Sequence, residues 1–324
     1  MPFAKSGTVW MNGRLVPWEQ ATIHVCSHVI HYGSCIFEGI RCYKTPQGSA
    51  IFRLREHTER LFDGCRIYRM EIPYTVDEIV AATVETVRIN KLDACYVRPL
   101  VYRGYESLGV DPFPCPIDVA IAVWPWGAYL GKDAIEKGVD VMVSSWRREA
   151  PDTLPAMAKA SANYMNSQLI KMEALVNGYA EGIALDSYGF VSEGSGENLF
   201  LVKKGVLYTP PLTASILPGI TRQSVLTLAA EMKLPIVERS LPREMLYIAD
   251  EVFFAGTATE ITPVRSIDRQ TVGRGTRGEI TERLQSEYLA ICAGRKADRH
   301  GWLTPVAPER VAVGVRPSAP VAGA

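Results

Sequence analysis

Short runs of alternating apolar and polar residues fill the first part of the chain, a pattern typical of half-buried β-strands. Thr8-Val9-Trp10-Met11 and Arg14-Leu15-Val16 flank Asn12-Gly13, a dipeptide that favours the tight turn of a hairpin. A second hairpin is predicted over residues 40–53, turning through Thr45-Pro46-Gln47-Gly48. The chain therefore begins with antiparallel β-structure.

The spacing of apolar residues then changes to that of a helix. One helix is predicted from about Leu54, and a second from Thr75, where Glu78 completes a capping box. Strands are expected to return at residues 94–103 and 117–124. These elements predict a small α+β domain over residues 1–124.

Strands and helices alternate in the rest of the chain, as expected for an α/β domain. The apolar runs expected to form strands are 139–144, 182–186, 190–203, 205–209, 238–241 and 252–255; the expected helices are 163–176, 221–233, 243–248 and 279–293. We expect an interdomain loop at 125–135, a large domain over 136–303 and a flexible tail at 304–324. The tail contains four prolines and no aromatic residue, so it can bury little surface.

Composition and charge narrow the function classes. The chain has 324 residues, 47% hydrophobic, with Lys+Arg and Asp+Glu both at 35. The balance of charge gives no electrostatic reason to expect a nucleic acid or an anionic membrane as partner. A net charge near zero also favours self-association.

Location and metal content are predicted from what the sequence lacks. No run reaches the roughly 20 apolar residues that span a bilayer, and the N-terminus has no continuous apolar segment of a secretory signal, so we expect a cytoplasmic protein. The seven cysteines are expected to be reduced thiols. The cluster His24–His31, with Cys35 and Cys42, lacks the spacing of known sites, so we predict no metal.

One lysine has unusual neighbours. Lys159 lies in Ala156-Met157-Ala158-Lys159-Ala160-Ser161-Ala162, where no acid is near in sequence. Most lysines are solvated surface charges. Among small apolar neighbours, however, desolvation disfavours the ammonium form, and only the neutral amine attacks an aldehyde.

Four further features are compatible with a site for an anionic, flat ligand. They are the helix start Leu217-Pro218-Gly219-Ile220-Thr221-Arg222, where Thr221 is the expected N-cap; the small residues of Ala255–Glu260; Arg60; and the glycine-rich stretch Val191–Phe200 around Glu193. Free N–H groups at a helix start attract phosphate, and Arg can clamp it bidentately. Each feature alone is more often a helix cap, a turn, a solvated arginine or a loop.

Taken in this order and with the lysine, the motifs resemble the fold-type IV pyridoxal-phosphate enzymes, and within them the branched-chain amino-acid aminotransferases. Three other segments resemble that subgroup: Glu38-Gly39-Ile40-Arg41-Cys42-Tyr43, Tyr96-Val97-Arg98-Pro99-Leu100 and Trp126-Gly127-Ala128-Tyr129-Leu130-Gly131. The resemblance extends from the first hairpin to His300-Gly301-Trp302-Leu303, and the tail departs from it.

The resemblance implies a two-domain enzyme with pyridoxal 5′-phosphate as cofactor. It implies ping-pong transfer of the amino group between leucine, isoleucine or valine and 2-oxoglutarate. Lys159 would bind the cofactor covalently and move the proton. The implied cofactor-binding residues are Arg60, Lys159, Tyr164, Glu193, Gly196, Ile220, Thr221 and Thr257, with Glu193 on the pyridine nitrogen, Tyr164 on the phenolic oxygen and the phosphate held by Arg60, Ile220, Thr221 and Thr257.

The implied substrate-binding residues are Tyr32, Phe37, Gly39, Tyr96, Arg98, Trp126, Tyr129, Thr257 and Ala258. Aromatic rings would hold the branched side chain, and Thr257-Ala258 with Tyr96 would hold the α-carboxylate. Arg98 would receive the distal carboxylate of glutamate. Some pocket residues in this family come from a neighbouring subunit, which implies a homodimer or a trimer of dimers.

Three alternatives remain open at this stage. A D-amino-acid transaminase or an aminodeoxychorismate lyase would share the lysine and the phosphate site. The glycine-rich segment Glu193–Asn198 could instead belong to a nucleotide-binding module without catalysis, but this sequence has no Gly-x-Gly-x-x-Gly fingerprint between a strand and a helix, and such a module gives Lys159 no role. A catalytically inactive scaffold would not need every expected catalytic position.

Overall fold

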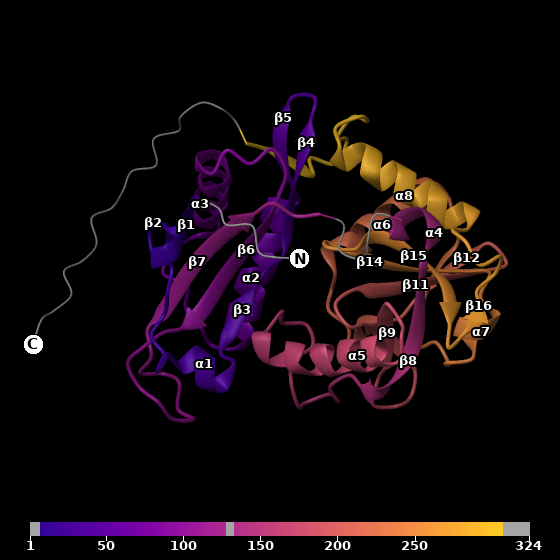
Figure 1. Cartoon of the computed structure of the whole chain (residues 1–324), viewed down its shortest axis with the longest axis horizontal. Helices are drawn as coiled ribbons and strands as arrows, with labels where there is room; N and C mark the ends of the chain where they lie inside the picture. Colours follow the sequence, from indigo (N-terminus) through magenta and orange to yellow (C-terminus); the bar gives the residue numbers. More distant parts are fainter. Residues whose placement is uncertain (1–6, 128–132, 307–324) are drawn as a thin grey trace, which may run out of the picture.

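The computed structural model describes residues 7–127 and 133–306, which form two β-sheets with helices packed against them (Figure 1). We propose that the two layers correspond to the predicted domains at 1–124 and 136–303, joined by residues 125–135. Residues 128–132 and 307–324, which include Tyr129 and most of the expected tail, lie outside the described residues. Mixed helices and sheets were predicted, and this fold class is confirmed.

The N-terminal sheet has the strand order β17-β5-β4-β6-β7-β1-β2, with β3 paired to β6. Its strands are β1 (Thr8–Met11), β2 (Arg14–Pro17), β3 (Cys35–Phe37), β4 (Ile40–Thr45), β5 (Gly48–Phe52), β6 (Cys95–Arg103), β7 (Ile117–Trp124) and β17 (Leu303–Pro305). Helices α2 (Leu54–Ile67) and α3 (Val76–Ile89) contact this sheet and bury its apolar face. Neighbouring strands of this sheet run antiparallel, which agrees with the hairpin signals.

The C-terminal sheet has the order β10-β9-β8-β15-β14-β11-β12-β13, with β16 paired to β15. Its strands are β8 (Val139–Arg147), β9 (Glu181–Leu185), β10 (Val191–Gly194), β11 (Asn198–Lys203), β12 (Val206–Thr209), β13 (Ile236–Glu238), β14 (Glu251–Gly256), β15 (Glu260–Ile267) and β16 (Gln270–Thr271). Helices α5 (Tyr164–Val176), α6 (Ile220–Glu231) and α8 (Glu279–Cys292) contact it.

Both faces of this second sheet are covered. Along β14, Phe253 joins the apolar cluster that includes residues of α6 and α8, whereas its neighbour Phe254 joins a different cluster with Leu246. Successive side chains of a strand point to opposite faces, so the sheet is buried on both sides. The remaining short helices are α1 (His28–Tyr32), α4 (Ala134–Lys137), α7 (Met245–Ile248) and the 3₁₀ turns η1 (Trp18–Gln20), η2 (Ser161–Asn163) and η3 (Leu212–Ala214).

The two predicted hairpins and the predicted capping box at Thr75 are confirmed. Both predicted hairpins form, and the Thr75 hydroxyl accepts from the backbone N–H of Glu78 while the Glu78 carboxylate accepts from the Thr75 N–H. Helix α5 begins at Tyr164, after a 3₁₀ turn. Among the described residues, no helix has the length and apolar character required to cross a membrane.

Other predictions differ from the structure. The strand predicted at 238–241 forms instead at Ile236–Glu238, because its parallel partner β12 ends at Thr209 and Pro210 follows. The single run 190–203 is divided into β10 and β11. The tail was expected from Thr304, yet this residue pairs with Ile51 of β5 in the N-terminal sheet.

Candidate active site

A cavity between the two sheets collects residues that are far apart in sequence. Its lining includes every predicted site residue that the structure describes, except Tyr32: Phe37, Gly39, Arg60, Tyr96, Arg98, Trp126, Lys159, Tyr164, Glu193, Gly196, Ile220, Thr221, Thr257 and Ala258. Tyr32 lies at the end of α1, is 45% exposed and packs its ring on His28. The predicted roles of these residues stay predictions.

Lys159 enters the cavity from the segment between β8 and η2. This segment is tied to the N-terminal sheet, because the backbone N–H of Phe37 donates to the Lys159 carbonyl at 3.0 Å. Lys159 Nζ donates to the phenolic oxygen of Tyr164 at 2.5 Å and lies 5.1 Å from the centroid of the Phe37 ring. Among the described residues no ion pair within 4.0 Å involves Lys159. The amine is therefore held by a phenol and lacks a carboxylate partner.

A group of donors lies on one side of the cavity. Arg60 on α2 donates to Glu38 through Nε at 2.7 Å and Nη2 at 2.8 Å, and through Nη1 to the Pro218 carbonyl at 2.9 Å. Helix α6 begins next to Pro218, and its first N–H groups have no acceptor within the helix. The fixed guanidinium and the helix start give this side the chemistry of a phosphate site.

The helix start itself differs from the prediction. Gly219 is the N-cap of α6, and Thr221, predicted as the cap, lies within the first turn. A Cβ on residue 219 would lie 1.9 Å from Asn198 Oδ1, so only glycine allows this approach. The chain thus enters the helix in contact with Asn198, which also contacts Glu193.

Glu38 holds the Arg60 side chain in position through two hydrogen bonds. Its carboxylate is fully buried and also hydrogen-bonds to His57 Nδ1 at 2.7 Å. Burial alone would raise the pKa of Glu38, but the charges and hydrogen bonds of Arg60 and His57 outweigh it and hold that pKa well below its usual range. Glu38 therefore remains an anion that fixes the guanidinium of Arg60.

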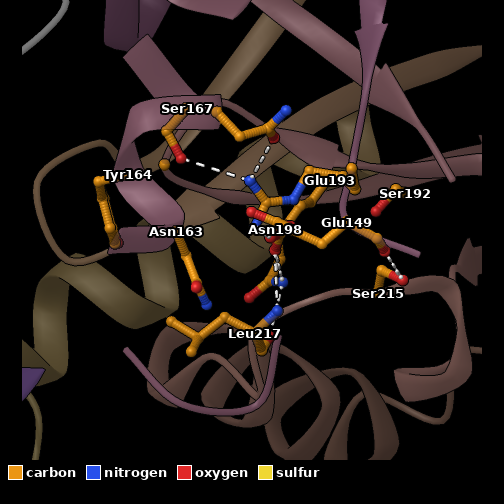
Figure 2. Close-up of polar contacts among 12 residues, drawn as sticks. Glu149, Asn163, Tyr164, Ser167, Ser192, Glu193, Asn198, Ser215 and Leu217 are labelled. Carbon is orange, nitrogen blue, oxygen red and sulfur yellow. Dashed lines mark hydrogen bonds and ion pairs between the residues drawn. The ribbon is translucent and has the colours of Figure 1, made fainter. Parts of the chain in front are cut away.

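Glu193 on β10 also lines the cavity. Its Oε2 accepts from Asn198 Nδ2 at 3.0 Å and from the Leu217 N–H at 3.1 Å, while its Oε1 lies 3.2 Å from Arg148 Nη2. Figure 2 shows Asn198 and Leu217 next to Glu193. Burial raises the pKa of this carboxyl to about 7, against the lowering effect of Arg148 and the Leu217 N–H. Oε1 keeps capacity for a further hydrogen bond from a ligand.

Aromatic rings and one arginine form the wall near β6. The Arg98 guanidinium carbon lies 4.7 Å from the centroid of the Phe37 ring and 5.3 Å from that of Tyr96. Arg98 Nε is buried and has no hydrogen-bond partner among the described residues. A Cβ on Gly39 would lie 2.0 Å from the Tyr96 hydroxyl, so glycine is required there. This wall offers apolar surface together with an incompletely satisfied cation.

Sequence reasoning missed several residues of this site. Glu38 and Asn198 stand inside the quoted motifs but received no role, and their neighbours in the motifs were the only available signal. Arg148 and Glu149 had no signal, since nothing in the sequence distinguishes Arg148 from the adjacent Arg147. In the described part of the chain, no group of three or more His, Cys, Asp or Glu side chains is arranged to hold a metal ion.

The chain matches a known family over most of its length. The pattern of the family described as amino-transferase class IV matches residues 35–267. A branched-chain-amino-acid aminotransferase of Salmonella typhimurium is 51% identical over 307 residues, covering 94% of this chain and 99% of that protein.

Two solved structures are also similar. The branched-chain amino acid aminotransferase of Escherichia coli has a TM-score of 0.92 at 50% identity, covering 94% of this chain and 100% of the other. The branched-chain amino acid aminotransferase of Thermobaculum terrenum, solved in its PLP-bound holo-form, has a TM-score of 0.87 at 37% identity, with coverage of 94% and 99%.

Proposed function

Because the chain belongs to the class IV amino-transferase family, we propose that it catalyses transamination between branched-chain L-amino acids and 2-oxoglutarate with pyridoxal 5′-phosphate as cofactor. The observation that carries this proposal is the cavity between the sheets. It combines an amine without a carboxylate partner among the described residues, a phosphate-type donor group and a buried carboxylate with a free acceptor position.

The residues present fit the cofactor. Arg60 and the first N–H groups of α6 match its phosphate, and Oε1 of Glu193 can accept from a protonated ring nitrogen. When bound, pyridoxal 5′-phosphate supplies an aldehyde for amines and a ring that withdraws electrons from the bonds of the substrate Cα. Gly196 and Thr257, which also line the cavity, would complete the contacts to the cofactor.

Lys159 would carry out the proton transfer. Its Nζ would bind the cofactor covalently and, once released by substrate, would take the proton from the substrate Cα and deliver it to the aldehyde carbon of the cofactor. Tyr164 fixes the position of Nζ through the 2.5 Å hydrogen bond. The phenol would also contact the phenolic oxygen of the cofactor. One amine would therefore serve both half-reactions.

Substrate recognition is proposed at the aromatic wall. Phe37, Tyr96 and Trp126 would hold the branched side chain, and the Thr257-Ala258 backbone would hold the α-carboxylate. Arg98 would bind the distal carboxylate of glutamate. Its charge next to aromatic rings allows the same pocket to accept an acidic and an apolar partner. Gly39, which has no Cβ, leaves room for the Tyr96 hydroxyl. Tyr32 and Tyr129 are also proposed to contact the substrate.

Arg98→Leu tests this dual recognition. We expect the variant to react with L-leucine within about threefold of the parent enzyme and to lose about 100-fold in kcat/KM for 2-oxoglutarate, since a charged hydrogen-bond partner is removed only from the acidic substrate. Each half-reaction is measured separately with substrate in excess over enzyme. Equal losses in both half-reactions would contradict the assignment of Arg98 to the distal carboxylate.

We propose that the functional particle is a homodimer or a trimer of dimers. Large apolar side chains are exposed in the segment before α1 and on the loop before β7, among them Val25 at 67%, Val110 at 88% and Phe113 at 67%. A monomer rarely exposes many such groups together. Light scattering on the eluted protein should give the mass of two or six copies, and a mass of one copy would contradict the proposal.

A further inference from the structure

A buried arginine, Arg148, contacts Glu193 and lines the same cavity. Arg148 follows β8, is 7% exposed and places Nη2 3.2 Å from Glu193 Oε1 and 3.3 Å from Glu149 Oε2. Its Nη1 donates to Asn166 Oδ1 at 3.0 Å and lies 3.4 Å from Ser167 Oγ, both on α5. The guanidinium is therefore fixed by a helix and shared between two carboxylates.

The charges of this cluster do not balance within the protein. Glu193 and Glu149 are both buried, and one guanidinium stands between them. Neither oxygen of Glu149 has a hydrogen-bond donor among the described residues, so Arg148 provides the compensating charge for both acids. With both carboxyls ionised the cluster carries one excess negative charge. A cation against Glu193 Oε1 would neutralise it.

We propose that Arg148 is a positioning residue that keeps Glu193 ionised, so that Glu193 holds the ring nitrogen of pyridoxal 5′-phosphate in its protonated form. This inference rests on the proposed function, and it concerns a residue that does not itself touch the reacting atoms. The ring nitrogen and Glu193 share one proton. It resides on the ring nitrogen when Glu193 is a carboxylate, and on Glu193 Oε1 when the carboxyl is neutral.

The charged side chains that act on Glu193 are those of Arg148, Glu149 and Lys159. Arg148 and Glu149 face it from the segment after β8 and Lys159 from the segment before α5, while Asn198 and the Leu217 N–H are neutral donors. Burial is the largest influence and raises the pKa of Glu193, Glu149 raises it further, and Arg148 is the strongest opposing charge. Without Arg148 the neutral carboxyl is favoured.

The inference is tested by ¹⁵N NMR of holoenzyme loaded with ring-¹⁵N pyridoxal 5′-phosphate, which reports whether the ring nitrogen is protonated. In the parent enzyme we expect the ¹⁵N resonance of a protonated pyridine at neutral pH. Arg148→Gln should move the resonance toward that of neutral pyridine, and Arg148→Lys should restore it because a cation is returned. Glu149→Gln is the matched control. It removes a charge from the same buried cluster, yet it leaves Arg148 on Glu193 and should keep the protonated resonance.

Affinity gives a second readout. Replacing the ring nitrogen of the cofactor by carbon removes the group that Glu193 holds. We expect Arg148→Gln to weaken binding of pyridoxal 5′-phosphate about 10-fold or more, as for loss of one charge-assisted contact, and to leave binding of the carbon analogue within about threefold. Equal weakening of both would mean that Arg148 only supports the local structure, and would overturn the inference.

A double variant covers the case in which Arg148→Gln fails to fold because it leaves Glu149 as an unpaired buried charge. Arg148→Met with Glu149→Gln removes the ion pair as a unit and leaves no unpaired charge from it. This double variant should also show the neutral-pyridine resonance. A protonated resonance in either variant that lacks Arg148 contradicts the inference. Failure of the parent enzyme to bind the cofactor would instead contradict the proposed function, so the two failures are distinguishable.

Discussion

Lys159→Ala is expected to abolish transamination, with a loss of at least about 10⁴-fold in kcat. The variant removes both the nucleophile for the cofactor aldehyde and the base at Cα, and general acid–base catalysis alone contributes about 10²–10⁴-fold. In the structure Lys159 Nζ is held by Tyr164 and has no carboxylate partner within 4.0 Å among the described residues. A water molecule in place of the Lys159 amine cannot bind the cofactor aldehyde as an imine. The rate is measured in single turnovers of the loaded variant with L-leucine.

The cofactor site should survive this substitution. Arg60, Glu193 and the start of α6 do not depend on the lysine side chain for their hydrogen bonds. We therefore expect the variant to retain pyridoxal 5′-phosphate noncovalently and to lack the visible band of the lysine-bound cofactor. Tyr164→Phe is a matched control, because it removes the hydrogen bond to Nζ but keeps the amine and should keep the band. Turnover by Lys159→Ala at more than about one hundredth of the parent rate would contradict the role of this lysine.

Glu193→Gln is expected to lower kcat by about 10²–10³-fold, the usual cost of removing one preorganised electrostatic contact. A neutral amide cannot hold a protonated ring nitrogen, so the ring withdraws electrons less effectively. Glu197→Gln is the control, since burial and the nearby Glu181 carboxyl raise the pKa of Glu197 well above its usual range and keep it neutral already. It should change kcat by less than about threefold. Equal effects of the two substitutions would contradict the special role of Glu193.

Glu193→Gln should also stabilise the cofactor-free protein. The folded-state pKa of Glu193 is raised to about 7, above its unfolded value, by burial. The stability linked to this group is therefore fully present below the unfolded pKa and is lost as pH rises through about 7, by up to about 3 kcal/mol. Glu193→Gln removes this loss. Urea unfolding of cofactor-free protein at pH 5 and pH 8, compared with Glu193→Gln, measures most of this loss, and a parent enzyme with no such pH dependence would contradict the assignment.

The parts of the fold with local signals could be predicted from the sequence. Asn12-Gly13 specifies its turn through backbone conformation, and Thr75 with Glu78 specifies a helix start through two local hydrogen bonds. The site motifs were informative for the same reason. Each places small or charged residues at fixed positions on one strand end or helix start, and the fold brings these ends together in one cavity.

The parts decided by distant contacts could not be predicted. The strand β15 was missed, since Pro263 signals against a central strand, yet it pairs there with Phe253. The start of α6 was misplaced because the close approach of Asn198 to Gly219 fixes the cap. Arg148 has a role only through its distances to Glu193 and Glu149, which no local pattern encodes.

The most direct test of the central claim is the absorbance spectrum of the purified protein before and after addition of L-leucine. We expect a visible band from the lysine-bound cofactor, and its replacement by the near-ultraviolet band of the pyridoxamine form when L-leucine is added. Addition of 2-oxoglutarate should then restore the visible band. A response to D-alanine but not to L-leucine would assign the chain to a D-specific transaminase. A protein that shows no visible band even with added pyridoxal 5′-phosphate would contradict the account.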